Sequence, residues 1–173
     1  FVQKRPIDIY ARANVMETLD ARYAYCFNPP QRGGGVPQIR LRAARHGEPI
    51  DLGGMEVMPL AVKHGKLDIL GFRLGGAFAY LTDCSHVPDE TVRLLEGIEV
   101  LVLDALRPRP HETHFGLEQA IDFADRIGVG QAWFTHMTCQ LEHFSTNASL
   151  PATRQLLYDG QILELPETLL PRS

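Results

Sequence analysis

The stretch Ala-Tyr-Leu-Thr-Asp-Cys-Ser-His, residues 79–86, decides the fold of this chain. It completes an apolar run with interspersed glycines over residues 70–81, which is typical of buried strands. The run stops at Thr82-Asp83, and Pro88 then stands where a helix can begin, because the first N–H groups of a helix need no partner. A carboxylate at the end of a buried strand lies at the rim of a sheet, where open α/β folds place their chemistry.

Three further apolar runs end on a polar residue in the same way. Residues 55–62 lead to His64, residues 100–103 to Asp104, and residues 132–135 to His136. If the four predicted strands are neighbours in one sheet, their terminal side chains form a single polar cluster.

From residue 79 onward the pattern predicts strand, helix, strand, helix, strand, which implies parallel strands joined by helical crossovers. The second helix, over residues 117–127, has apolar residues at helical spacing. Other expectations are a strand at 6–11, a helix capped by Asn14 and ending near Arg22, a loop at 28–37, a hairpin at Gly75-Gly76, a polar loop at 137–147, a short helix at 151–157 and a last strand at 161–165.

The composition is that of an ordinary globular protein. A length of 173 residues predicts one domain, and 45% hydrophobic with 22% charged residues is usual for this class. The net charge of −4 argues against an extended nucleic-acid partner. No apolar run approaches the ~20 residues of a membrane helix. Three scattered cysteines, without a Cys-x-x-Cys pair, favour the reducing cytoplasm.

Taken alone, each candidate residue has an ordinary structural explanation. His64 suits a turn, Asp83 a helix cap, His136 a core histidine, Asp104 an ion pair, and Arg107, Arg109, His111 and His114 a solvated loop. Taken together, two imidazoles and a carboxylate at three strand ends are a ligand mixture for Zn, Mn or Fe. A carboxylate can bridge two metal ions, and two neighbouring metal ions can bind a phosphodiester. A further histidine can then protonate the leaving oxygen.

A succession of segments supports a resemblance that extends over essentially the whole chain. These segments are Lys63-His64-Gly65, Leu81-Thr82-Asp83-Cys84-Ser85, Val102-Leu103-Asp104-Ala105-Leu106-Arg107, Pro110-His111-Glu112-Thr113-His114-Phe115, Phe134-Thr135-His136-Met137 and Tyr158-Asp159-Gly160. The chain resembles the metallo-β-lactamase superfamily, and within it the branch of phosphoribosyl 1,2-cyclic phosphate phosphodiesterases. The resemblance implies an α/β fold, the αββα sandwich, with residues 1–173 as a single domain that corresponds to the C-terminal two-thirds of the family fold.

The resemblance also implies roles for individual residues. His64 would bind one metal ion, Asp83 would bridge two ions, and His136 would bind the second. His114 matches the histidine that is not a ligand and assists phosphodiester cleavage. Asp104 and Thr135 would be supporting residues behind the metal ligands. We infer from charge and position that Arg107 or Arg109 contacts the substrate phosphate. Cys139 stands where relatives often have a histidine, and it is either near the site or a small buried hydrophobe.

One family feature is missing from these 173 residues, the leading ligand motif His-x-His-x-Asp-His. In the family this motif precedes the segment that resembles residues 1–10. We therefore expect that an N-terminal segment is absent, that the metal site is incomplete, and that this polypeptide by itself binds two ions poorly and is inactive.

The expected parent protein is a hydrolase with two divalent metal ions, Zn or Mn, that cleaves phosphodiester bonds of a small cyclic phosphate or nucleotide-like substrate. We expect a small-molecule partner, no membrane and no extended nucleic acid, and we leave a homodimer open. One alternative is a tRNA-processing type of nuclease from the same superfamily, although the sequence has no long basic arm. The other is a metal-free binding protein that retains the fold.

Overall fold

The computed structural model describes residues 5–28 and 35–165. The chain divides into two compact units, residues 1–45 and residues 46–173. Most of the predicted loop at 28–37 lies outside the described residues. That residues 1–173 act as one domain stays a prediction.

The first unit is a short β-α-β arrangement. It contains β1 (Ile7–Ala11), α1 (Ala13–Arg22), α2 (Ala24–Phe27) and β2 (Ile39–Ala43). The two strands pair in parallel, with Ile7 opposite Ile39. Asn14 was expected to cap the helix, but α1 begins at Ala13 and Asn14 lies inside its first turn. The carbonyl of Asn14 instead accepts a hydrogen bond from the Thr18 hydroxyl at 2.9 Å.

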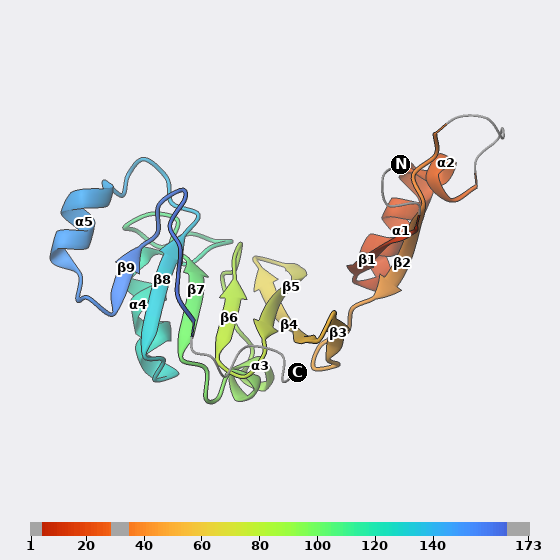
Figure 1. Ribbon diagram of the computed structural model, residues 1–173. Coiled ribbons are helices and arrows are strands. Elements are labelled where there is room, and N and C mark those ends of the chain that lie inside the picture. The colour runs from red at the N-terminus through yellow and green to blue at the C-terminus, as the bar shows by residue number, and fades with distance from the viewer. Residues whose placement is uncertain (1–4, 29–34, 166–173) are drawn as a thin grey trace. The chain divides into compact units, whose positions relative to one another are not determined.

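The second unit is built on a seven-stranded sheet in the order β3-β4-β5-β6-β7-β8-β9 (Figure 1). The strands are β3 (Ile50–Leu52), β4 (Met55–His64), β5 (Leu67–Leu74), β6 (Phe78–Leu81), β7 (Val100–Asp104), β8 (Gln131–Thr135) and β9 (Arg154–Leu156). The helices are α3 (Asp89–Leu94), α4 (Leu117–Arg126) and α5 (His143–Ser149). Strands β6 to β9 are parallel, which confirms the predicted crossovers.

Strand direction decides where the polar strand ends lie. Strand β5 is antiparallel to both β4 and β6, so β4 runs in the same direction as β6, β7 and β8. The carboxyl ends of these four strands therefore lie along one edge of the sheet. This edge carries all four of the predicted polar strand ends.

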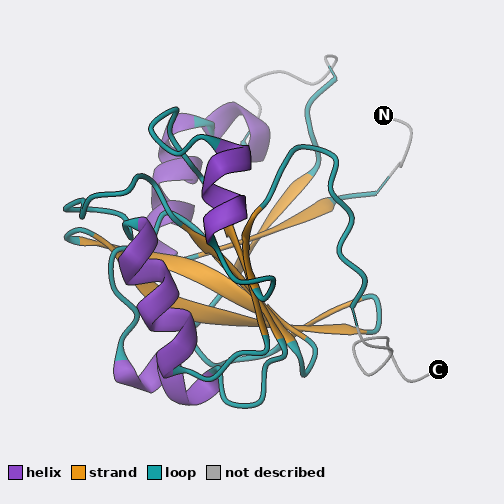
Figure 2. Ribbon diagram, turned by 90° about the vertical axis from the view of Figure 1, so that its left-hand side faces the viewer, coloured by secondary structure: helices purple, strands orange, loops and turns teal. Residues whose placement is uncertain are grey.

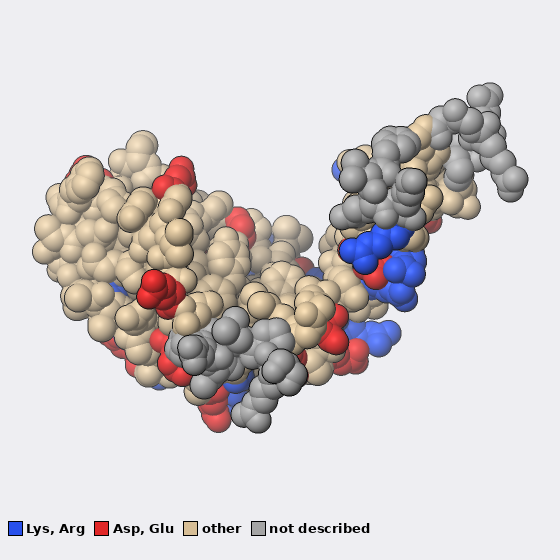
Figure 3. Space-filling model, viewed as in Figure 1, with Lys and Arg blue, Asp and Glu red and all other residues tan. Residues whose placement is uncertain are grey.

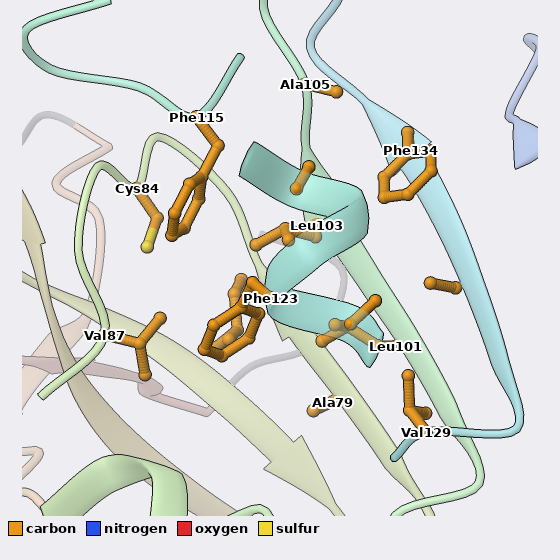
Figure 4. Packing of buried hydrophobic residues seen from close by; sticks show 14 of the residues in the cluster. Ala79, Cys84, Val87, Leu101, Leu103, Ala105, Phe115, Phe123, Val129 and Phe134 are labelled. Carbon is orange, nitrogen blue, oxygen red and sulfur yellow. The ribbon is translucent and has the colours of Figure 1, made fainter. Parts of the chain in front are cut away.

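The core lies between the sheet and helices α3 and α4, which cover one of its faces (Figure 2). Side chains of α4, with Phe123 at the centre, pack on Leu101 and Leu103 of β7 (Figure 4). Leu101, Leu103 and Phe134 have no exposed surface, and each such side chain contributes roughly 1.5–3 kcal/mol by burial. The α/β class is thus confirmed, as a sheet with helices on one face, which is one half of the predicted sandwich.

Three expectations for the C-terminal region are wrong. The predicted polar loop at 137–147 contains the start of α5, whose N-terminus is capped by the Glu142 side chain accepting from the N–H groups of Phe144 and Ser145. The predicted helix at 151–157 is instead strand β9, because pairing with the exposed edge of β8 overrides local propensity. Residues 161–165 form no regular strand.

No helix among the described residues has both the length and the apolar character needed to cross a lipid bilayer.

Gly71 permits β5 and β6 to pack closely, so we expect Gly71→Ala to destabilise the second unit. A Cβ at this position would lie 2.3 Å from Leu81 Cδ2 and 3.0 Å from the Tyr80 carbonyl oxygen. We expect a loss of about 1–3 kcal/mol in the free energy of unfolding, measured by urea denaturation. The matched control is Gly76→Ala, whose Cβ would meet nothing within 4 Å, and a change beyond about 0.5 kcal/mol there would contradict the steric explanation.

Candidate metal centre

Four side chains meet at the carboxyl edge of the sheet. His64 ends β4, Asp83 lies just past β6, His136 directly follows β8, and His114 comes from the loop before α4. Asp83 Oδ1 lies 3.4 Å from His114 Nε2 and 3.3 Å from His136 Nε2. The ring of His114 lies between the other two imidazoles, with centroids 4.6 Å from His64 and 4.9 Å from His136. The structure therefore brings together the residues predicted from the strand ends and the predicted loop histidine.

Three of these residues present ligand atoms close enough to hold one metal ion. One atom each from His64, Asp83 and His114 lies within 4.8 Å of the others. Two imidazole nitrogens and a carboxylate oxygen suit Zn²⁺ and related ions, so the donor set fits the expected cofactor. The resemblance implies His136 rather than His114 as a ligand beside Asp83, and the structure places both imidazoles against the same carboxylate oxygen.

The backbone is strained at two members of this cluster. Asp83 and His136 have φ values of 56° and 61°, and they are the non-glycine residues with positive φ in the part of the chain that the structure describes. Such conformations cost about 1–3 kcal/mol each and gather at functional sites, where the surrounding fold imposes them. Both residues turn the chain sharply where a strand ends, and their side chains meet.

The end of β4 is fastened to the segment that follows β6. The N–H of Ser85 donates to the Lys63 carbonyl at 2.7 Å. The N–H of Gly65 donates to the Ser85 hydroxyl oxygen at 2.9 Å, and Gly65 has a φ of 59° that favours glycine. These bonds hold His64 beside Asp83 although the two strands are separated by β5.

Thr113 orients two of the histidines. Its carbonyl accepts a hydrogen bond from His64 Nδ1 at 3.0 Å, and its hydroxyl lies 2.8 Å from His114 Nδ1. With Nδ1 engaged, each ring has Nε2 left to bind a metal ion, and in His114 this nitrogen lies 3.4 Å from Asp83 Oδ1. Such outer hydrogen bonds fix the tautomer and orientation of metal-binding histidines. Sequence reasoning missed this role, for which the only signal was the position of Thr113 beside His114.

Asp104 holds the loops that carry the cluster. Its side chain is fully buried, Oδ1 accepts from the Cys84 N–H at 2.9 Å, and Oδ2 accepts from the Phe115 N–H at 3.1 Å. Each donor directly follows a member of the cluster, Asp83 or His114. Burial raises the pKa of Asp104 to about 7, against the effect of the two N–H donors, which favour the ionised form.

The remaining predicted residues have the following places. The Thr135 carbonyl accepts from the Ala105 N–H at 2.9 Å, which continues the β7–β8 pairing. The Arg107 guanidinium donates to the carbonyls of Arg109 and Pro110 at 3.3 and 2.8 Å, so it braces its own loop. Arg109 is exposed, and Cys139 is an exposed free thiol, which excludes the alternative of a small buried hydrophobe.

Burial and the neighbouring rings of His64 and His136 lower the pKa of His114, while the Asp83 carboxylate acts in the opposite direction. The neutral imidazole is therefore favoured, and this is the form that can bind a metal ion.

Comparison with known proteins identifies the family. The family model described as "Beta-lactamase superfamily domain" matches residues 1–137. The chain belongs to the metallo-β-lactamase superfamily, as the motif resemblance implied.

Two relatives are each about one-third identical in sequence to this chain. A crystal structure described as a new diphosphatase from the PhnP family is 34% identical with a TM-score of 0.81, and the match covers 95% of this chain and 60% of that protein. An octanoyltransferase of Porphyromonas gingivalis (strain ATCC BAA-308 / W83) is 32% identical over 137 residues, which is 78% of this chain and 27% of that protein. The chain thus spans less than two-thirds of the length of either relative, 60% of the first and 27% of the second.

A more distant likeness shows the fold alone. Zn²⁺-bound PqqB from Methylobacterium extorquens is 16% identical with a TM-score of 0.68, over 93% of this chain and 66% of that protein.

Removing the Asp104 carboxylate should leave the Cys84 N–H buried without an acceptor, whereas the Phe115 N–H keeps the Cys84 carbonyl as its acceptor at 2.8 Å. Because one orphaned donor costs roughly 1–3 kcal/mol, we expect Asp104→Ala to lower the free energy of unfolding by about 1–3 kcal/mol in urea denaturation. Asp104→Asn keeps one acceptor and should lose less. Asp122→Ala, at an exposed position on α4, is the control, and an equal loss there would refute a specific role for Asp104.

The hydroxyl of Thr113 should matter for the metal centre more than for the fold. Thr113→Val removes the bond to His114 and leaves the backbone carbonyl that accepts from His64. If His114 is a ligand, as the triplet with His64 and Asp83 allows, we expect a roughly 10- to 100-fold loss of metal affinity, measured by competition with a chromogenic chelator. Thr113→Ser keeps the hydroxyl and should bind metal like the wild type, so equal affinities of the Val and Ser variants would contradict this role.

Proposed function

We propose that this chain supplies part of the active site of a metal-dependent phosphodiesterase that acts on a small cyclic phosphate or nucleotide-like ester. The observation that carries the proposal is the position of Asp83 Oδ1 between two imidazoles, at 3.4 Å from His114 Nε2 and 3.3 Å from His136 Nε2. A carboxylate in this position is suited to bridge two ions. The 34% identity to a PhnP-family diphosphatase supports phosphorus chemistry.

In this proposal His64, Asp83 and His136 hold two divalent ions, Zn or Mn, together with ligands from outside these residues. When bound, the ions supply Lewis-acid activation of water and neutralise charge on phosphate. When its ring is protonated, a form that the neighbouring Asp83 carboxylate favours, His114 can give the proton on Nε2 to the departing alkoxide oxygen and is left as a neutral imidazole. Thr113 keeps that nitrogen pointed at the cluster by engaging Nδ1.

A small substrate fits the charge of the protein better than a nucleic acid does. The net charge is −4, and over the second unit the face in Figure 3 shows scattered carboxylates and no broad patch of Lys or Arg. This supports a small-molecule substrate over the alternative of a tRNA-processing nuclease. The proposal includes a cytoplasmic location, supported by three free cysteines, and it leaves a homodimer open.

The test uses the protein as its gene encodes it, including any residues before Phe1, loaded with Zn²⁺ or Mn²⁺. We expect hydrolysis of bis(p-nitrophenyl) phosphate together with a metal-dependent rise in Tm. Asp83→Asn should abolish both the rise in Tm and the hydrolysis, because it removes the bridging charge. Absence of bound transition metal in the purified wild type would favour the metal-free binding protein.

His114→Ala separates a proton donor from a ligand. If His114 is the proton donor, kcat should fall roughly 10²- to 10⁴-fold while the metal content stays the same. His86→Ala, at an exposed histidine outside the cluster, should leave both unchanged. Loss of metal together with activity in His114→Ala would make His114 a ligand instead, in line with its place in the triplet with His64 and Asp83.

A further inference from the structure

We propose that Phe144 and Tyr158 form a stacking shelf for a planar ring of the substrate beside the metal centre. This inference rests on the proposed function and narrows its substrate class to phosphate esters that carry a nucleobase or a similar aromatic group. The stacking shelf consists of Phe144 in the first turn of α5, Tyr158 just after β9, and His143, which both rings contact.

The two rings are unusually exposed for large apolar side chains. Phe144 is 82% exposed and Tyr158 is 61% exposed. Each lies edge-to-face with the His143 ring, with centroid distances of 5.6 and 6.1 Å and interplanar angles of 87° and 90°. Both exposed rings are gathered around His143, and exposed aromatic side chains gathered at one place mark binding sites more often than isolated exposed residues do.

The His143 ring, which both aromatic rings contact, is fixed to the sheet by hydrogen bonds. His143 Nε2 donates to the Leu156 carbonyl of β9 at 3.2 Å. Asn147, one turn further along α5, accepts from the Leu156 N–H at 2.7 Å, and Glu142 caps the helix at the N–H of Ser145. Because these hydrogen bonds fix His143, the ring against which Phe144 and Tyr158 lie is already in place before a ligand binds, which lowers the ordering cost of binding.

Strand register places the shelf close to the metal centre. Strands β8 and β9 are parallel neighbours with Phe134 opposite Leu156, and the Leu157 N–H donates to the Phe134 carbonyl at 2.8 Å. His136 and Tyr158 each lie two residues beyond that pair, so their backbones leave the sheet at the same edge, about one to two strand spacings or ~5–10 Å apart. A phosphate held at Asp83 and His136 would therefore have its ester group within reach of the shelf.

A planar aromatic group is the occupant that this surface fits. Base stacking on aromatic side chains needs no hydrogen-bonding code, since every base has a π-face. The shelf offers the two exposed rings of Phe144 and Tyr158 and contains no Lys or Arg, so it suits a single ring on a small ester better than a polyanion.

The first arm of the test is independent of metal and catalysis. Adenosine, which carries no phosphate, is titrated into the protein while the aromatic proton resonances of Phe144 and Tyr158 are followed by NMR. We expect upfield shifts of both rings that saturate, and Phe144→Ala with Tyr158→Ala should weaken the binding roughly tenfold. Ile162→Ala, at another exposed apolar residue (87% exposed), should bind adenosine like the wild type. The absence of shifts, or equal binding by all variants, would overturn the shelf.

The second arm asks whether the shelf serves the substrate. With the metal-loaded enzyme, kcat/KM is compared for adenosine 2′,3′-cyclic phosphate and for the same cyclic phosphate of ribose without a base. We expect the wild type to prefer the base-bearing ester, and the double variant to lose this preference because its KM for that ester rises. Ile162→Ala, outside the shelf, should keep the preference of the wild type. Equal kcat/KM for both esters in the wild type would overturn the inference. If no phosphate ester is hydrolysed, the proposed function fails, and the adenosine arm alone decides whether the shelf binds a ring.

Discussion

The buried carboxylate of Asp104 is the interaction on which the candidate metal centre depends. It accepts one N–H directly after Asp83 and another directly after His114, at 2.9 and 3.1 Å. The two loops leave the same edge of the sheet, and the Phe115 N–H also donates to the Cys84 carbonyl at 2.8 Å, so the shared acceptor and this backbone bond together hold the loops in contact. The cost of removing this carboxylate from water is reflected in the pKa of Asp104, which burial raises to about 7. The two N–H donors offset part of this desolvation, because they favour the ionised carboxylate.

Strand direction also determines which residues meet at the candidate metal centre. Because β5 reverses the chain between β4 and β6, His64 arrives at the same edge as Asp83 and His136. The hydrogen bonds of Thr113 and Ser85 then set the distances within that edge. The rigid sheet thus determines which residues meet, and the loops determine how their nitrogen and oxygen atoms are aimed.

Much of this could be read from the sequence, and the parts that could not have a physical reason. Apolar runs that end on His or Asp predicted the edge and its residues, since burial and strand ends leave a strong local pattern. The orientation of His64 depends on a backbone carbonyl of Thr113, and a carbonyl leaves no trace in the residue type. The cap at Glu142 and the strand at 154–156 were missed because each depends on a partner: an N–H donor of the next turn, or the free edge of β8. The stacking shelf was likewise invisible, because exposure is a property of the folded surface.

The left-handed backbone at Asp83 has a consequence for which amino acids this position can accept. A φ of 56° is tolerated by glycine and, among side chains, chiefly by asparagine and aspartate, whose short polar groups suit it. The cluster, for its part, asks for an anionic oxygen, which aspartate and glutamate can supply. Only aspartate both tolerates the left-handed backbone and supplies an anionic oxygen, so a single residue type satisfies this position.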